Sequence, residues 1–206
     1  MYRKLYFCVC AGQQEEMYLK HLAQLLKKPN ERVVTFNTTV GSAELLRRNY
    51  TEYDKAVLFD HDFNEVEFER NIKTCVELDR ESQKKRKRKG ERIYHAYSNV
   101  NFDLWLILHK EDYTRPVTRT DAYVDEVRRV YGLDPEADIK NRDAIKKILD
   151  QIELNDVKEA IRRTERIRAG KLECDGFYVC SEVCYNNPDF SIHKFLKDVL
   201  EDCGEL

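Results

Sequence analysis

The sequence contains no apolar run that approaches the roughly 18 residues of a membrane-spanning helix. Its first residues, MYRKLYFCVC, lack the apolar core and small-residue cleavage site of a secretory signal peptide. The seven cysteines are an odd number, which does not suit a framework of paired disulfides. These absences predict a soluble, cytoplasmic protein without membrane association, whose thiols are reduced.

Other missing patterns narrow the possible functions. Neither G-x-x-x-x-G-K-S/T nor G-x-G-x-x-G is present, which weighs against a phosphotransferase or nucleotidyltransferase. No serine or cysteine has a supporting base at a recognisable spacing, so a nucleophilic hydrolase is not indicated. No repeat or low-complexity linker divides the 206 residues, a length that suits one domain or a domain with a helical appendage.

The charges nearly cancel, with 36 Lys and Arg against 38 Asp and Glu, so the net charge of −2 gives no overall attraction to nucleic acid. Their distribution is uneven, because residues 83–92 (QKKRKRKGER) hold seven positive side chains and one negative. Such a block either attracts phosphate groups or remains a solvated helix end, and the sequence leaves both interpretations open. The candidate phosphate contacts are Lys84, Lys85, Arg86, Lys87 and Arg88.

Short apolar runs alternate with helical patterns in the first half of the chain. Strands are predicted at 4–10, 32–36, 55–59 and 93–97, and helices at 15–28, 42–50 and 65–89. This alternation predicts an α/β fold with a mainly parallel sheet flanked by helices. Further helices are predicted at 102–109, 121–131, 141–151, 155–169 and 191–200, whereas 170–185 is ambiguous. A boundary near residue 112 would separate an α/β domain (1–112) from a helical C-terminal region (113–206) packed on it.

The stretch AVLFDHDFNE (56–65) runs from a buried strand directly into two aspartates, Asp60 and Asp62. Ligands of open α/β sheets collect beyond the carboxyl ends of the strands, so both side chains are expected at a ligand site. Two such close carboxylates favour a hard cation such as Mg²⁺ or Mn²⁺. Alternatively, Asp60 caps the next helix and Asp62 opens a turn.

The first strand also ends in polar residues, CAGQQEEMY (10–18). If strands 1 and 3 are neighbours, Glu15 or Glu16 lies near the two aspartates and completes a metal site. In the alternative interpretation these glutamates only complement the helix dipole.

The segment SNVNFDLWLILH (98–109) follows the fourth strand. Ser98 or Asn99 is expected to cap the next helix, and Asp103 to lie one turn in, at the edge that holds the other acids. Phe102, Trp105 and Leu106 are expected in the core. His109 is either a hydrogen-bonded histidine at a helix end or a group that contacts the scissile phosphate.

The remaining cysteines suggest two alternatives. Cys174, Cys180 and Cys184 with His193 invite a zinc interpretation, but their spacings do not fit a Cys-x-x-Cys knuckle, and buried thiols are the alternative. Cys8 and Cys10 alternate with apolar neighbours in the first strand and are expected to pack in the core.

Four motifs together, CAGQQEEMYL, FDHD, SNVNFDLWLILHKEDYTRP and NPDFSIHKFL, resemble the RloB-like family of bacterial defence proteins, which is related to the AbiL abortive-infection component. The third motif is the most specific, with Ser98, Asn99, Phe102, Asp103, Leu104, Trp105 and His109. The resemblance covers nearly the whole chain and implies a Toprim-like fold, the metal-binding module of topoisomerases, primases and overcoming-lysogenization-defect nucleases.

The resemblance implies a nuclease dependent on Mg²⁺ or Mn²⁺ that acts on DNA or RNA in anti-phage defence, controlled by an ABC-type ATPase encoded nearby. Asp60 and Asp62 match the Asp-x-Asp pair, while Gly12 and Glu15 match part of a Glu-Gly-x-x-Glu motif. Glu15, Asp60 and Asp62 are the expected metal ligands; Asp103 and His109 join them as catalytic candidates, and Asn99 is expected to contact the substrate. Ala11 stands where the family usually has the first glutamate, so the alternative is a catalytically weakened module that binds nucleic acid or the ATPase.

Overall fold

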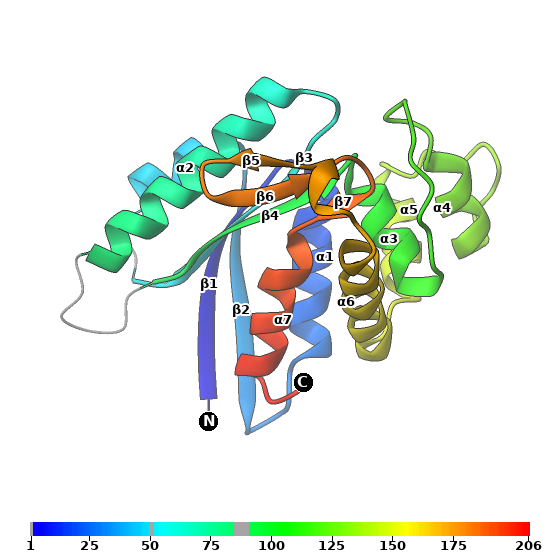
Figure 1. The fold of residues 1–206 in the computed structure, drawn as a ribbon. Coiled ribbons are helices and arrows are strands. Elements are labelled where there is room, and N and C mark those ends of the chain that lie inside the picture. The colour runs from blue at the N-terminus through cyan, green and yellow to red at the C-terminus, as the bar shows by residue number, and fades with distance from the viewer. Residues whose placement is uncertain (1, 50–51, 85–90) are drawn as a thin grey trace.

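The computed structural model describes residues 2–49, 52–84 and 91–206. A five-stranded sheet with the strand order β2-β1-β3-β4-β7 forms its centre (Figure 1). The first four of these strands are parallel to their neighbours, and only β7 runs antiparallel, beside β4. The predicted α/β class with a mainly parallel, helix-flanked sheet is therefore confirmed, and it is consistent with a Toprim-like fold.

The elements follow one another in a βαβ pattern before the chain becomes mostly helical. In order they are β1 (Tyr2–Cys10), α1 (Gln13–Leu25), β2 (Arg32–Val40), η1 (Ala43–Arg48), β3 (Asp54–Asp60), α2 (Glu65–Lys84), β4 (Ile93–Asn99), α3 (Phe102–Lys110), α4 (Val124–Tyr131), α5 (Arg142–Leu149), α6 (Leu154–Ala169), η2 (Glu173–Asp175), β5 (Gly176–Val179), β6 (Glu182–Tyr185), β7 (Asp189–Phe190) and α7 (Ile192–Asp202).

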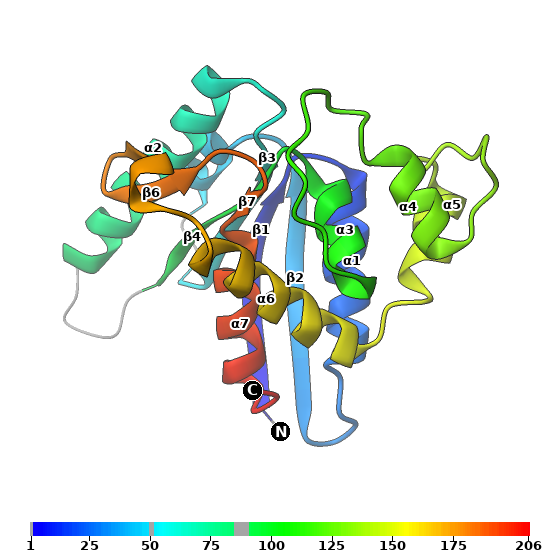
Figure 2. The same ribbon diagram turned by 45° about the vertical axis from the view of Figure 1, so that its right-hand side comes forward.

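The sheet is covered on both faces (Figure 2). On one face α1, α3, α6 and α7 bury alternate strand residues such as Cys8 and Leu58. On the other, η1, α2 and the β5–β6 hairpin cover Val9 and Val57. The strand Ala56–Phe59 is consequently at most 4% exposed, which explains why its sequence shows no polar alternation.

The C-terminal region contains the predicted helices and, in addition, three short strands. The ambiguous segment 170–185 contains the short antiparallel hairpin β5–β6, and the chain then returns to the sheet as β7. Core residues from both sides of residue 112, such as Leu58, Trp105 and Val157, belong to one packed cluster. The last strand and helix therefore complete the sheet that the first half of the chain begins.

The cysteines differ in their burial. Cys8 and Cys10 are fully buried in the core, as predicted. Cys174 and Cys180 are exposed free thiols, whereas Cys184 is buried beneath the hairpin. In residues 2–49, 52–84 and 91–206, no helix is both long and apolar enough to cross a membrane.

Candidate active site

Strands β1, β3 and β4 end at the same edge of the sheet, the upper edge in Figure 1. Backbone hydrogen bonds join these ends: Ala11 N–H donates to Leu58 O (2.8 Å), and His61 N–H donates to Ser98 O (3.1 Å). Side chains that follow the three strands are therefore held close together, as expected for the ligand edge of an open α/β sheet.

At the end of β1, Glu15 folds back onto the first turn of its own helix. The Gly12 N–H donates to Glu15 Oε2 (3.0 Å), and the glutamate is only 4% exposed. Burial raises the pKa of Glu15, and nearby Asp103 adds to the effect. Ala11 is exposed at the same edge, where its methyl group offers no ligand. Strand β1 thus supplies one buried carboxylate to the edge.

At the end of β3, the chain turns sharply through two residues with left-handed backbone, Asp62 (φ 46°) and Phe63 (φ 55°). The N–H groups of His61 and Asp62 both donate to Val100 O (3.0 Å each), which ties the turn to the segment after β4. Asp62 is exposed on this turn, so it does take the turn position that the sequence left open.

Asp60 does not cap the helix that follows. That position belongs to Asn64, whose Oδ1 accepts from Glu67 N–H (3.2 Å) at the start of α2. Burial raises the pKa of Asp60 well above its usual value, and the negative charges of Glu15 and Asp62 raise it further. Although Asp62 is exposed on the turn, partial desolvation of its carboxylate and the negative charge of Asp103 raise its pKa. The surroundings therefore disfavour the ionised form of both aspartates unless a cation is bound beside them.

Asp103 joins this edge from the first turn of α3 and is 1% exposed. The helix begins after Asn101, so the expectation that Ser98 or Asn99 caps it is wrong: β4 continues through both residues before the chain turns. Asn99 is buried, and its Nδ2 donates to Tyr185 O (3.2 Å).

Lys140, which the sequence did not suggest, provides the positive charge at the site. It lies between α4 and α5, and its Nζ is 3.2 Å from Asp103 Oδ1 and 3.4 Å from Gln14 Oε1. Burial alone would lower the pKa of Lys140, but Asp103, Asp60 and Glu15 raise it. Lys140 lies outside all four motifs, and an isolated loop lysine forms no pattern that the sequence alone could show.

The carboxylates have the right chemistry for a hard cation but not a closed coordination sphere. Among the residues that the structure describes, no three His, Cys, Asp or Glu side chains are arranged around one metal position. Two buried polar atoms near this edge, Gln14 Nε2 and Asn99 Oδ1, lack a hydrogen-bond partner in the described chain. Buried polar atoms normally have one, and oxygen-rich sets suit Mg²⁺ or Mn²⁺. The donor set therefore fits such an ion in its chemistry, and the Lys140 ammonium lies beside it.

His109 is at the far end of α3 from Asp103 and is buried in the core. Its Nδ1 contacts Trp105 O (2.8 Å) and its Nε2 contacts the Tyr18 hydroxyl (3.1 Å). Burial lowers its pKa to about 4. With both ring nitrogens engaged, the geometry favours the hydrogen-bonded structural histidine over a group that contacts phosphate.

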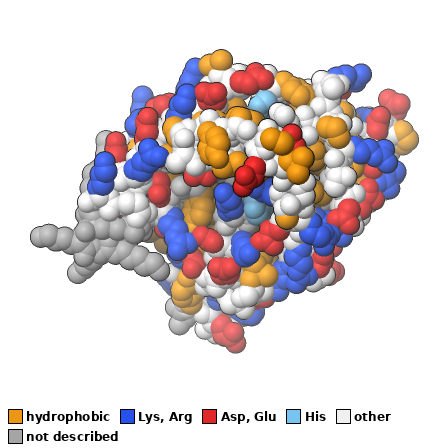
Figure 3. All heavy atoms as spheres, in the orientation of Figure 1, with side chains coloured by type: hydrophobic (Ala, Val, Ile, Leu, Met, Phe, Trp, Pro, Cys, Tyr) orange, Lys and Arg blue, Asp and Glu red, His pale blue; other side chains and the backbone are white. Residues whose placement is uncertain are grey.

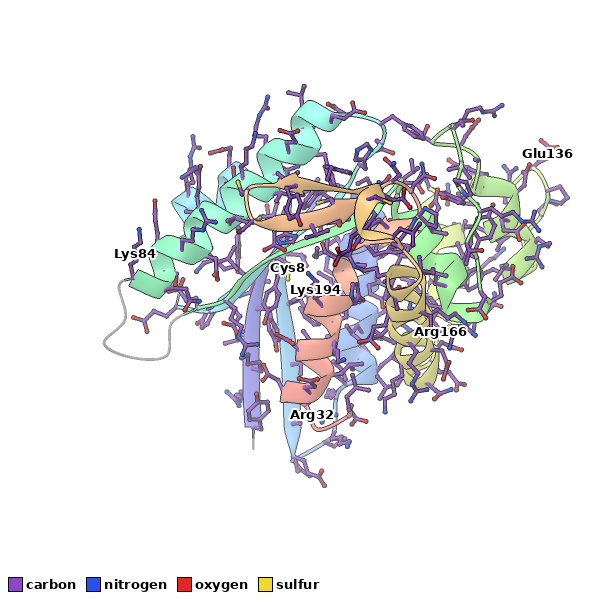
Figure 4. All side chains as sticks on the ribbon, viewed as in Figure 1. Cys8, Arg32, Lys84, Glu136, Arg166 and Lys194 are labelled. Atoms are coloured by element: carbon purple, nitrogen blue, oxygen red, sulfur yellow. The ribbon has the colours of Figure 1, made fainter. Side chains whose placement is uncertain are left out.

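Of the basic block, only Lys84 is among the described residues, and it lies far from the acids. Lys84 ends α2, at the opposite end of that helix from the Asp60–Asp62 turn (Figure 4), and a 20-residue helix is about 30 Å long. Lys85, Arg86, Lys87 and Arg88 lie outside the described residues. On the face seen in Figure 3, positive and negative side chains are intermixed.

Fold and site together define an α/β protein with an acidic site at the carboxyl edge of a parallel sheet. The RloB-like protein family model matches residues 6–197, so the chain belongs to that family. No curated protein and no solved structure showed a significant match to it.

Proposed function

We propose that this protein is a divalent-metal-dependent nuclease. The observation that carries the proposal is the arrangement around Lys140: Glu15, Asp60 and Asp103, from three different elements, all act on one ammonium group at the sheet edge. Perturbed ionisable groups gathered at such an edge are typical of catalytic sites.

Each side chain has a role in this proposal. Asp60 and Asp62 would hold Mg²⁺ or Mn²⁺, and Glu15 would add a ligand or orient the attacking water. When bound, the metal supplies charge stabilisation at the phosphate and a more acidic water. Before metal binds, Asp103 pairs with Lys140, and Asn99 lines the flank of the site with a carbonyl oxygen that has no partner among the described residues.

Nucleic acid as substrate is supported by an exposed aromatic side chain beside the acids. Phe63 follows Asp62 directly and is 39% exposed, and Val66 in the first turn of α2 is 70% exposed. An exposed aromatic ring at this position can stack on an unpaired base while the neighbouring acids face the phosphate. The basic block from Lys84 to Arg88 would add contacts to phosphates remote from the site.

Family membership supports the biological setting of the proposal. As an RloB-like protein, the chain would act in anti-phage defence within the cytoplasm, and an ABC-type ATPase encoded nearby would control it. Co-purification with that ATPase would support this arrangement, whereas full activity of the isolated chain would contradict obligate control.

A second candidate function, a binding module without catalysis, has its own support. Ala11 removes one acid from the edge, and in the described chain no three potential ligands converge on one point. Such a module would bind nucleic acid or the ATPase and leave its substrate intact.

Cleavage of a substrate panel distinguishes the two functions. Plasmid, single-stranded DNA, total RNA and tRNA would be incubated with Mg²⁺ or Mn²⁺, with and without the neighbouring ATPase. The wild type is compared with the double variant Asp60→Asn, Asp62→Asn, and with Glu16→Gln as the control. Glu16 is next to Glu15 but accepts from Thr38 Oγ1 (2.8 Å) and Lys20 Nζ (2.8 Å), away from the cluster.

Cutting that requires metal, that the double variant loses and that Glu16→Gln retains would support the nuclease. If no substrate is cut under any condition although the protein is folded and binds nucleic acid, the binding module is the better description.

A further inference from the structure

Hydrogen bonds fix the backbone around Lys140 at the acidic edge, whereas its side chain is largely exposed. Its own N–H donates to Asp138 Oδ1 (2.9 Å), and the neighbouring Asn141 caps α5 by accepting from Asp143 N–H (2.9 Å). Ile139 is buried and anchors the loop. The Lys140 side chain itself is 54% exposed, so the ammonium can leave the acids without unfolding the loop.

The acids need a cation in the folded protein. Asp103 is 1% exposed and Glu15 4%, and a buried carboxylate without a partner is costly. Within hydrogen-bonding distance of Asp103, Lys140 is the cation that the structure places there. Removal of Lys140 without a replacement would therefore leave several close carboxylates uncompensated.

Gln14 provides an independent sign that the site accepts a further ligand. It is 4% exposed, and its Oε1 accepts from Lys140 (3.4 Å), so its amide lies at the acids. Its Nε2 is buried without a partner in the described chain. An unused N–H donor beside carboxylates suits an oxygen atom of a ligand, such as a metal-bound water or a phosphate oxygen.

We propose that Lys140 is a resident cation: it neutralises the acids when no metal is bound, and a divalent cation that enters the site displaces it. This inference rests on the proposed metal-dependent function. The exchange also explains why the oxygen ligands do not surround one point in this structure. An ammonium group donates three hydrogen bonds in separate directions, whereas a metal ion gathers its oxygen ligands around itself.

Metal binding measured without substrate tests the exchange. Mn²⁺ affinity would be determined by calorimetry for the wild type, Lys140→Met and Lys146→Met. Lys146 is an exposed lysine of α5, so its variant removes the same charge outside the cluster. Loss of the competing ammonium should tighten Mn²⁺ binding of Lys140→Met at least about tenfold, which corresponds to about 1.4 kcal/mol, while Lys146→Met stays near the wild type.

Lysine labelling of the wild-type protein gives a second measurement that needs no variant. Acetylation by a water-soluble reagent, followed by peptide mass spectrometry, should modify Lys140 several times faster when Mn²⁺ is present, with no change at Lys146. Equal labelling with and without metal, or an unchanged or weaker affinity in Lys140→Met, would overturn the exchange.

The controls separate this inference from the proposed function. If the wild type binds Mn²⁺, Asp60→Asn does not, and Lys140→Met behaves like the wild type, the metal site stands and the resident-cation role is wrong. If neither the wild type nor Lys140→Met binds Mn²⁺, both proposals are wrong.

Discussion

Arg168 of α6 forms an ion pair with Asp189, a fully buried residue of the two-residue strand β7. The same guanidinium donates to Phe190 O (2.7 Å) and Val183 O (3.1 Å), and the Tyr97 hydroxyl donates to Asp189 Oδ2 (2.5 Å). Strand β7 is too short to form many backbone hydrogen bonds with β4. These side-chain contacts therefore fix it to the sheet.

Breaking this pair should destabilise the fold strongly. Arg168→Ala leaves Asp189 buried and unpaired, and such changes typically cost about 3–5 kcal/mol. Urea unfolding would measure the loss. Arg162→Ala is the control, because Arg162 is an exposed residue of the same helix that pairs only with nearby Glu159 among the described ion pairs. Equal effects of the two substitutions would contradict the anchoring role.

Asp60→Asn should make the metal-free protein more stable while removing its metal affinity. Burial and the charges of Glu15 and Asp62 disfavour the ionised Asp60, so a neutral amide relieves repulsion. We expect a gain of about 1 kcal/mol in the free energy of unfolding at pH 7. Functional sites commonly sacrifice stability for activity in this way. A destabilised variant would show that Asp60 has a structural role instead.

His109 should make stability fall in acid. Burial lowers its pKa from 6.5 to about 4, so the folded state resists protonation while the unfolded state accepts it. Stability is complete above pH 6.5 and is lost as the pH falls toward 4, at about 1.4 kcal/mol per pH unit from this group. Its charged neighbours are Asp156, Lys110 and Arg163.

The variant His109→Phe tests this. Between pH 7 and pH 5 the wild type should lose about 2 kcal/mol more than the variant, measured by urea unfolding. Although the variant starts from a lower stability, only the slope with pH is compared. Buried His193, whose pKa is lowered to about 3 by burial and by Arg168, contributes equally to both proteins. Parallel pH profiles would rule out His109 as the source.

Phe63→Ala should weaken binding of single-stranded substrates about fivefold or more, since stacking of one base is worth about 1–3 kcal/mol. Binding to the Asp60→Asn, Asp62→Asn background by fluorescence anisotropy avoids cleavage. Val66→Ala removes exposed apolar surface without a ring and serves as the control. Should both variants bind like their parent, the aromatic side chain has no role in recognition.

The basic block should affect binding of nucleic acid but not its cleavage. Glutamine would replace Lys84, Lys85, Arg86, Lys87 and Arg88. We expect lower affinity for nucleic acid and an unchanged rate of cleavage of the bound substrate. Each lost phosphate contact should reduce the salt dependence of binding by about 0.7–0.9 in the logarithmic slope. Because α2 separates Lys84 from the acids by about 30 Å, the chemical step should not change. Binding that barely responds to salt in the wild type would exclude this role.

The acids could be predicted from the sequence because they directly follow apolar runs. Asp60 ends a strand whose four preceding residues are all buried, and this local pattern fixes both the strand and its edge. Glu15 lies a few residues further on, in the first turn of the helix that follows the first strand. The neighbouring strands β1 and β3 then bring the two motifs together, as the βαβ alternation predicts.

Lys140 and β7 could not be predicted in the same way. Lys140 belongs to a loop, and only tertiary packing brings it to Asp103, 37 residues earlier in the chain. Strand β7 has two residues, too few for a hydrophobic period, and its pairing depends on Arg168 and Tyr97. Contacts between side chains that are far apart in the chain leave no local pattern in the sequence from which they could be predicted.

The pairing of Ser98 with Phe190 also dictates when the site becomes complete during synthesis. The acids emerge from the ribosome well before Lys140, and the last strand of the sheet emerges later still. Long-range pairing of this kind is slow, because a large loop must close first. A nascent chain therefore carries the acidic residues for some time before Lys140 and Phe190 are available to pack beside them.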